Sequence, residues 1–523
     1  MVKEPIHILR QIKKGLGCVL VLAVVCELLF FPTLSNAYGC FMAAVSYGVF
    51  CYFLKEKYIR LFPFSFCMYL SMFMYRYLPL IATIVERKPI TYGFERPYET
   101  FVYEIILFLI SSFAFYLACQ KTEYIGKNNV IQKSLFKLGF FKVTPEIIWA
   151  MGTIGLVIRL YNFSAGDVEY GDVGGKFLLG LDYLMYAPLC LFFPSLMKLK
   201  YNNQKVLLVY GLLIFILNIA SNSRRQIIIP IGIIIILLFL YLVLNNLKIT
   251  TFLSPFKIAF FGLALILLLN LISNISLAML YTRKVRSDIG KLELFQQTID
   301  VINDKVLMDR LKIMKDQEST GLISYQEGWT EHYVDNFMLA RYANVRITDE
   351  TLYYAEKKGY SNKQMQILFV ENIQALFPTP ILSLFGVYID KSKLEFSRGD
   401  FLYGSGFGGY RVTSHVGDGL ATFGFWYFLI QFIVYFFIFK LLNSFVFCLK
   451  EEILYAPFAL MNVFTFLGKF RNATGITGDL SYVIRGFAQG VITYFIIFYL
   501  VRTLLWLVDP KYVENDEVNY PSS

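Results

Sequence analysis

The sequence predicts an all-α polytopic membrane protein, and composition and the length of its apolar runs carry that prediction. Hydrophobic residues make up 57% of the 523 residues and charged residues only 17%, whereas charged residues make up about 25% of a typical soluble protein. The mean hydropathy is +0.55. Apolar runs recur at roughly 17–25 residues, the length of a helix that crosses the hydrocarbon core. A membrane β-barrel would instead show short segments of alternating polarity.

We expect about twelve membrane spans, with one large polar loop between the ninth and the tenth. The basic N-terminal residues lead into the first apolar run without a small-x-small cleavage site, so we expect a membrane span there and no removed signal peptide. The expected spans are 16–34, 37–54, 61–85, 101–119, 146–162, 177–197, 206–221, 226–244, 256–280, 420–440, 454–468 and 485–507.

Lysine and arginine in the short loops set the expected orientation, because such residues favour the cytoplasmic side. The loop 120–145 is rich in lysine, while 163–176 is acidic and rich in glycine. An even number of spans places both termini in the cytoplasm and the polar loop outside. We therefore expect an N-terminal membrane bundle at 1–280, an extracytoplasmic cap at 281–419 with a re-entrant element at 367–388, C-terminal membrane helices at 420–507 and a cytoplasmic tail at 508–523.

The end of the polar loop, 397–424, concentrates charged and titratable residues where the chain re-enters lipid. It contains Arg398, Arg411, His415, Asp400 and Asp418 among several glycines. Glycine lets the backbone approach a ligand closely. Ionisable groups at the edge of the membrane are costly and therefore suggest a functional site.

A second landmark is the adjacent pair Arg224 and Arg225, which interrupts a nearly continuous apolar stretch. One interpretation is a plain outward hairpin whose arginines reach the headgroups. The other is a phosphate-binding turn, because the guanidinium fork matches phosphate oxygens. The expected orientation places this pair on the same side as Arg398, Arg411 and His415, and this coincidence favours an anionic ligand at the outer face.

Two further arginines, Arg283 and Arg286, follow the 256–280 span directly. They are either anchors for acidic lipid headgroups or part of a diphosphate site. His415 is the leading candidate for a general base, since an unperturbed imidazole is a proton acceptor near neutral pH. Asp418 is the second candidate, or the group that orients the imidazole. The alternative is that His415 is a structural, hydrogen-bonded histidine. His332 is the other histidine expected on the outer side and is the rival candidate for the base.

Several motifs of other function classes are missing from the sequence. It contains neither a P-loop nor an HExxH motif. The eight cysteines form no CxxC pair, so we expect no metal site, no disulfide framework and no cofactor. The net charge of +11 is distributed over loops between membrane spans, so nucleic acid is not an expected partner.

The layout resembles the Wzy-type O-antigen and oligosaccharide repeat-unit polymerases. The residues that carry the resemblance are SNSRRQ at 221–226, Arg398 followed by Gly409 after ten intervening residues, and GYRVTSHVGDGLATFG leading into a span. The resemblance implies a GT-C-like membrane fold in the bacterial inner membrane. It also implies a glycosyltransferase that needs neither metal nor nucleotide sugar.

The chemistry implied by this resemblance is transfer of a glycan from undecaprenyl diphosphate onto a lipid-linked repeat unit. Arg224, Arg225 and Arg411 would then stabilise the diphosphate leaving group, and His415 or Asp418 would accept the proton of the attacking hydroxyl. Arg398 with Gly409 would shape the glycan cleft, and a chain-length regulator is a possible partner. An O-antigen ligase, a flippase for lipid-linked oligosaccharide and a structural assembly subunit are the alternatives. A flippase is expected to carry charges at mid-membrane depth.

Overall fold

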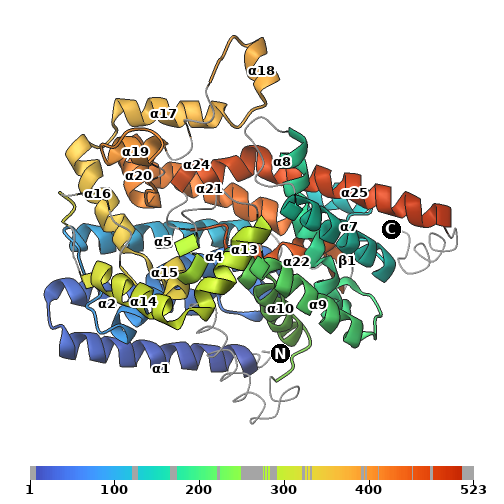
Figure 1. Ribbon diagram of the computed structural model, residues 1–523, viewed down its shortest axis with the longest axis horizontal. Coiled ribbons are helices and arrows are strands. Elements are labelled where there is room, and N and C mark those ends of the chain that lie inside the picture. Colours follow the sequence, from blue (N-terminus) through green and yellow to red (C-terminus); the bar gives the residue numbers. More distant parts are fainter. Residues whose placement is uncertain are drawn as a thin grey trace. The chain divides into compact units, whose positions relative to one another are not determined.

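The structure is a computed structural model of the whole chain (Figure 1). It describes residues 7–120, 128–164, 173–220, 224–248, 275, 277–279, 281–282, 291–320, 324–326, 328–329, 333–389, 394, 397–409, 411–449, 452–471 and 475–508. The chain divides into two compact units, each assembled from separated segments. Unit 1 comprises Met1–Lys121, Asp316–Asn443 and Phe466–Phe487, and unit 2 comprises Thr122–Lys315, Ser444–Thr465 and Ala488–Ser523. Each unit combines segments from both halves of the chain.

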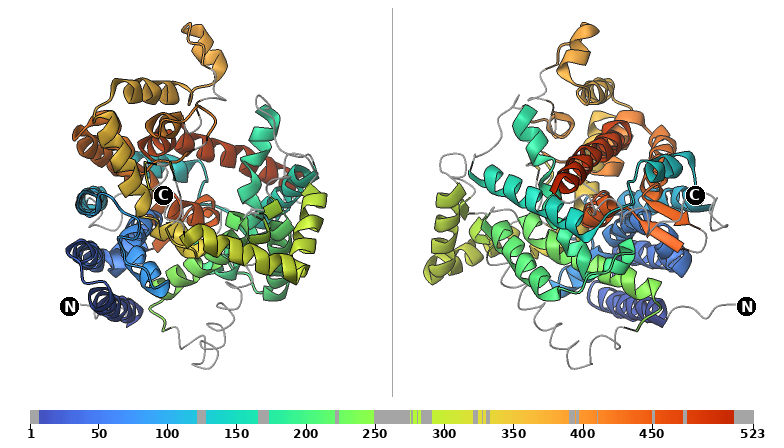
Figure 2. Two further views of the ribbon diagram at one scale, coloured as in Figure 1. Left: turned by 60° about the vertical axis from the view of Figure 1, so that its left-hand side comes forward. Right: turned by 90° about the vertical axis from the view of Figure 1, so that its right-hand side faces the viewer.

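Unit 1 contains the N-terminal helices and most of the polar loop. Helix α1 runs alongside α2, and α2 packs on α4 and α5 (Figures 1 and 2). Helix α16 packs on α20, and α21 on α5. The elements of this unit are α1 His7–Phe30, α2 Leu34–Phe53, α3 Glu56–Leu61, α4 Pro63–Val85, α5 Pro97–Cys119, α15 Phe337–Ala343, α16 Arg346–Lys358, α17 Lys363–Gln374, α18 Thr379–Leu384, α19 Ser397–Leu402, α20 His415–Phe423, α21 Trp426–Asn443, α24 Gly475–Ser481 and the π-helical turn η6 Tyr482–Gly486.

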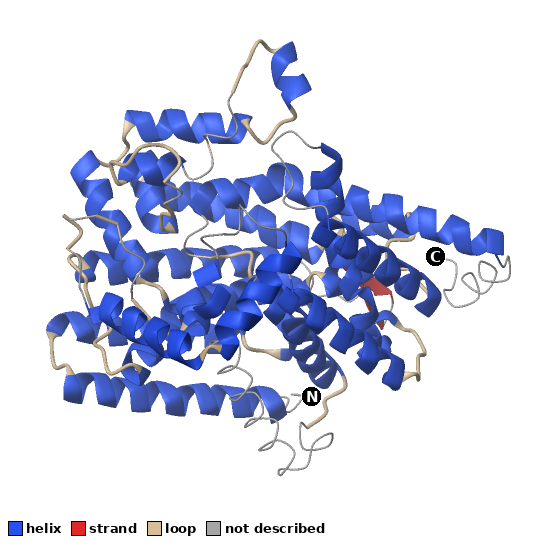
Figure 3. Ribbon diagram, in the orientation of Figure 1, coloured by secondary structure: helices blue, strands red, loops and turns tan. Residues whose placement is uncertain are grey.

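Unit 2 contains one antiparallel strand pair, drawn in red in Figure 3, and otherwise helices in its described residues. Helix α7 packs on the 3₁₀ segment η2, and α9 packs on α10. The elements are α6 Val130–Lys137, α7 Pro145–Ser164, α8 Val173–Leu179, η2 Asp182–Phe192, η3 Pro194–Met197, α9 Gln204–Ala220, α10 Arg224–Leu244, α13 Lys291–Asn303, α14 Lys305–Thr320, β1 Val446–Leu449, β2 Glu452–Tyr455, α22 Pro457–Met461, α23 Val463–Leu467 and α25 Phe487–Val508. Helices α14, α23 and α25 begin in one unit and end in the other.

The expected all-α membrane class is confirmed. Among the described residues, six helices are long and apolar enough to cross a membrane: Leu34–Phe53, Pro63–Val85, Pro97–Cys119, Gln226–Leu244, Trp426–Asn443 and Gly475–Val508. Each of them overlaps one of the expected spans. Helices α1 and α7 are also long, with 24 and 20 residues. The span expected at 256–280 lies almost wholly outside the described residues.

Three expected spans differ from the structure. The single helix expected at 454–468 is wrong, because β2, α22 and α23 divide that stretch. The stretch 177–197 is mostly 3₁₀ helix, with Pro188 inside it, and proline removes a backbone donor that an α-helix needs. The span expected at 420–440 is interrupted at Gly424, whose φ of 58° ends α20 before α21 begins.

Local sequence signals explain the helix boundaries around the candidate site. The Ser414 hydroxyl accepts a hydrogen bond from the Gly417 backbone N–H and caps α20, and the Asn362 side chain caps α17 in the same way. Such caps satisfy donors that have no partner within the helix. Pro378 separates α17 from α18, so the break expected within 367–388 is confirmed.

Candidate functional site

The segment after α19 is a loop folded around the buried carboxylate of Asp400. Its Oδ2 accepts hydrogen bonds from the backbone N–H groups of Gly408, at 3.0 Å, and Gly409, at 3.1 Å. Its Oδ1 accepts one from the Arg411 backbone N–H at 3.0 Å. Gly408 has a φ of 98°, a conformation that glycine adopts without steric cost. Asp400 thereby fixes the backbone position of Arg411.

The same loop is held on its other side by a close backbone approach. A Cβ atom added at Gly399 would clash with the carbonyl oxygen of Arg411, so only glycine fits. The Arg411 side chain itself is half-buried. Among the described residues, no carboxylate forms an ion pair with it. The loop therefore presents a guanidinium from a fixed backbone position.

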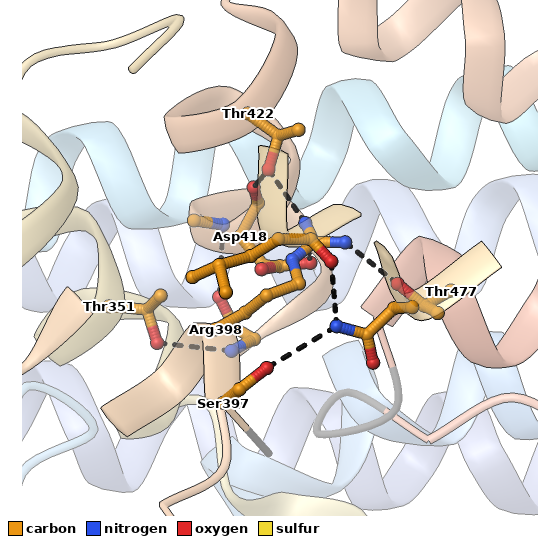
Figure 4. Close-up of polar contacts among 10 residues, drawn as sticks. Thr351, Ser397, Arg398, Asp418, Thr422 and Thr477 are labelled. Carbon is orange, nitrogen blue, oxygen red and sulfur yellow. Dashed lines mark hydrogen bonds and ion pairs between the residues drawn. The ribbon is translucent and has the colours of Figure 1, made fainter. Parts of the chain in front are cut away.

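Arg398 differs, because it is buried inside unit 1 and both of its Nη atoms bond to side chains of that unit. Its Nη2 donates to Asp418 Oδ2 and to the Thr422 hydroxyl, each at 2.6 Å, and its Nη1 donates to the Thr477 hydroxyl at 2.7 Å. Figure 4 shows this arginine among the three side chains. It thus connects α19 to α20 and α24. A buried ion pair of this kind fixes geometry, and removing one partner leaves an uncompensated charge.

Burial changes the proton affinities of this pair in a consistent way. Desolvation lowers the pKa of Arg398, although Asp418 opposes that shift. Desolvation also raises the pKa of the Asp418 carboxyl, against the stabilising effect of Arg398. Asp418 Oδ1 has no hydrogen-bond partner within the described part of the chain. One oxygen of this carboxylate is thus bound to arginine, and the other can still accept a proton.

Helix α16 holds the first turn of α20 in place. The Thr351 hydroxyl lies 3.0 Å from the Tyr403 hydroxyl and accepts a hydrogen bond from the Ser414 backbone N–H at 3.0 Å. A Cβ atom at Gly417 would meet Thr351 atoms at 2.5–2.9 Å. The glycine therefore permits the close contact between α16 and α20.

His415 is completely buried, with 0% of its surface exposed. Its ring stacks on Phe470, with centroids 5.0 Å apart, and its Nε2 lies 3.7 Å from Asp479 Oδ2. Burial, and secondarily the charge of Arg76, lower the pKa of His415 to about 3. The imidazole is therefore neutral at physiological pH, but a pKa this low makes it a weak base.

Asp479 and Gln431 complete the surroundings of His415, and the sequence did not single them out. Gln431 Nε2 donates to Asp479 Oδ2 at 2.8 Å, and both side chains have 0% of their surface exposed. The sequence signal was weak but present, because Asp479 lies directly before the last apolar run. Carboxylates beside membrane spans are functional candidates by default.

A second buried ion pair joins two long apolar helices. Arg76 of α4 and Glu104 of α5 lie 2.7 Å apart, with side chains 0% and 1% exposed. The Arg76 guanidinium also donates to the Met72 and Glu104 carbonyl oxygens, and the Thr348 hydroxyl of α16 donates to Glu104 at 2.6 Å. Arg76 is therefore held within the helix bundle of unit 1 by Glu104 and two backbone carbonyl oxygens.

The structure brings together Arg398, Gly409, Arg411, His415 and Asp418 within unit 1. The structure describes no side chain of the other expected site residues. Arg224 and Arg225 begin α10 in unit 2, and their side chains lie outside those described. Arg283, Arg286 and His332 lie outside the described residues. Arg159 of α7 forms an ion pair with Asp182 and donates a hydrogen bond to Gln226 within unit 2.

Within the described part of the chain, no three histidine, cysteine, aspartate or glutamate side chains gather as a metal site. The fold and site define an all-α membrane protein with a buried polar centre beside a glycine-rich loop. Comparison with family models, curated proteins and solved structures finds no match.

Proposed function

We propose that the protein is a membrane glycosyltransferase that polymerises lipid-linked oligosaccharide. It would transfer a growing glycan from undecaprenyl diphosphate onto a lipid-linked repeat unit at the outer face of a bacterial inner membrane, with both termini in the cytoplasm. The single observation that carries this proposal is the position of Arg411. Its backbone is fixed by Asp400 and Gly399, and its guanidinium is half-buried without a described carboxylate partner.

Arg411 suits a diphosphate for chemical reasons. A guanidinium binds two phosphate oxygens in parallel, and a cation held in place costs little reorganisation when charge develops on a leaving group. Arg398 suits this role less well, because Asp418 neutralises it. We assign Arg411 to the leaving group and Arg398 to holding α19, α20 and α24 together.

In the proposed reaction, the acceptor hydroxyl oxygen bonds to the anomeric carbon of the donor glycan. The bond from that carbon to the diphosphate oxygen breaks, and undecaprenyl diphosphate leaves with the electron pair. The hydroxyl proton passes to a base. Asp418 suits this role better than His415, because burial raises the pKa of Asp418 and lowers the pKa of His415 to about 3. Both residues are buried, so opening of the segment precedes the reaction.

The test is a chain-length assay in proteoliposomes supplied with lipid-linked repeat units. We expect wild-type protein to make long glycans and Arg411→Ala to leave single repeats. Arg341→Ala is the matched control, because Arg341 is an exposed arginine of the same unit. Full-length product from Arg411→Ala, at wild-type amounts of folded protein, would overturn the assignment of this residue.

A second function is favoured by a different observation. The Arg76–Glu104 pair lies inside two membrane helices, and charges within the membrane are a feature of carriers. A flippase for lipid-linked oligosaccharide is therefore the alternative proposal. Vesicles that contain the protein and a labelled lipid-linked glycan distinguish the two. A carrier moves the label between leaflets without changing glycan length, whereas a polymerase lengthens the glycan.

A further inference from the structure

The interior of unit 1 contains a group of buried polar side chains that the proposed transfer reaction does not use. They are Asp479 of α24, Gln431, Tyr427 and Tyr435 of α21, and the ring nitrogens of His415 at the start of α20. All five residues have 0% of their surface exposed. Helix α24 continues through η6 into α25, and this continuous helix is long and apolar enough to span a membrane.

Several polar atoms in this group have no hydrogen-bond partner within the described part of the chain. They are Asp479 Oδ1, Gln431 Oε1, the Tyr427 and Tyr435 hydroxyls, and both ring nitrogens of His415. A buried polar atom without a partner costs about 1–3 kcal/mol. This carboxylate oxygen and the five other such atoms therefore indicate a site that binds something small and polar.

The distance between His415 and Asp479 indicates that a small molecule connects the two side chains. The 3.7 Å from His415 Nε2 to Asp479 Oδ2 is too long for a direct hydrogen bond, and a polar contact of this length is often bridged by water. The carboxylate is held from one side only, by the Gln431 amide at 2.8 Å. Its second oxygen faces the interior without a described donor.

We propose that Asp479 is a proton-binding site, with internal water linking its carboxyl group to His415 Nε2. In the protonated state the carboxyl O–H donates to water or to a tyrosine oxygen. In the deprotonated state Asp479 Oδ1 accepts from water or from a tyrosine hydroxyl. His415 acts as the neutral partner that accepts from, or donates to, the bridging water. This proposal does not depend on the transferase, because it concerns only proton uptake by the folded protein.

The charged groups around the site leave the carboxylate of Asp479 without a lysine or arginine salt-bridge partner among the described residues. The positive groups near it are Lys469, which interacts electrostatically with Asp479, and Arg76, which interacts with His415. Glu104 already balances Arg76, and Arg398 already balances Asp418. The carboxylate of Asp479 therefore has no salt bridge to Lys or Arg among the described residues. The ionisable groups facing the site are Arg76 from α4, Glu104 from α5, His415 and Asp418 from α20, Tyr427 and Tyr435 from α21, and Lys469 from the segment before α24.

The test is infrared difference spectroscopy of the full-length protein in lipid nanodiscs during a pH titration. We expect a protonated-carboxyl C=O band that loses intensity as pH rises, and we expect Asp479→Asn to remove the Asp479 component of that band. Asp335→Asn is the control, because Asp335 is a partly exposed carboxylate paired with Lys88, and we expect it to keep the band. A titrating band that persists unchanged in Asp479→Asn would overturn the proposal.

A second measurement keeps the proposal testable if Asp479→Asn does not fold. The chain has three histidines, so the double variant His7→Gln, His332→Gln leaves only His415 for ¹⁵N labelling. We expect a neutral imidazole with a hydrogen-bonded nitrogen whose resonance shifts when the carboxyl titrates. Two nitrogens without hydrogen bonds, at the same positions across the whole titration, would contradict a water-linked proton site.

Discussion

Arg398 and Arg411 lie on the same glycine-rich segment but have opposite environments. Arg398 is only 6% exposed and bonds to Asp418, Thr422 and Thr477. Arg411 is half-buried, and its described contacts run through its backbone to Asp400. The comparison teaches that an arginine in a motif can either hold the structure together or meet a ligand. Burial and a charged partner distinguish the two.

The largest expected effect on stability follows from breaking the buried Arg398–Asp418 pair. Arg398→Ala leaves the Asp418 charge buried without its partner, and breaking such a pair costs about 3–5 kcal/mol. We expect a marked fall in the free energy of unfolding, measured by thermal or denaturant unfolding in detergent. The double variant Arg398→Met, Asp418→Leu removes both charges and should recover much of the loss. An unchanged melting temperature for Arg398→Ala would show that the pair does not stabilise the segment.

A smaller loss is expected when the loop around Arg411 loses its anchor. Asp400→Ala removes the acceptor of three backbone N–H groups, and a hydrogen bond to a charged group contributes about 1.5–3 kcal/mol. We expect a destabilisation of at least about 2 kcal/mol, together with faster amide hydrogen exchange at 408–411. Protection of these amides at the wild-type level would show that Asp400 does not hold the backbone of Arg411 in place.

The pH dependence of stability tests whether the buried imidazole of His415, beside these arginines, stays neutral in the folded protein. The pKa of His415 falls from 6.5 to about 3 on folding. Between these values the unfolded chain binds more protons, so the free energy of unfolding falls as pH drops from about 6.5 to 3. His415→Gln should remove this component of the acid loss. Identical pH profiles for both proteins in chemical denaturation would contradict a buried neutral imidazole.

The smallest effect on stability is expected for Arg411 itself. Substitutions at the surface away from special contacts change stability by about 0.5 kcal/mol or less. We expect Arg411→Ala to unfold within that range of wild type while activity is lost. Circular dichroism melts of both proteins provide the measurement. A destabilisation comparable to that of Arg398→Ala would show that Arg411, like Arg398, has a structural role.

The sequence predicted the membrane class, the approximate position of six candidate spans and the segment that contains the candidate site. Those features follow from run length and hydropathy, which act locally along the chain. It also singled out Arg398, Arg411, His415 and Asp418 together, because charged residues next to an apolar span are conspicuous. The roles of these residues needed coordinates, since burial and partner choice depend on packing.

Partners far apart in the chain were beyond sequence reasoning. Arg398 reaches Thr477 on another helix, and His415 faces Asp479 across the same region. No spacing rule relates such positions, in contrast to neighbours on one helix. The strand pair β1–β2 was missed for a related reason, because each strand has only four residues and is too short to show a period that distinguishes it from other structure.

The most direct test of the account is binding of a polyprenyl diphosphate to the purified protein, measured by native mass spectrometry. Wild type and Arg341→Ala should bind it equally. Arg411→Ala should bind about tenfold or more weakly, a difference of about 1.4 kcal/mol, while it melts at the wild-type temperature. Equal binding by Arg411→Ala and wild type would contradict the assignment of this arginine to the diphosphate.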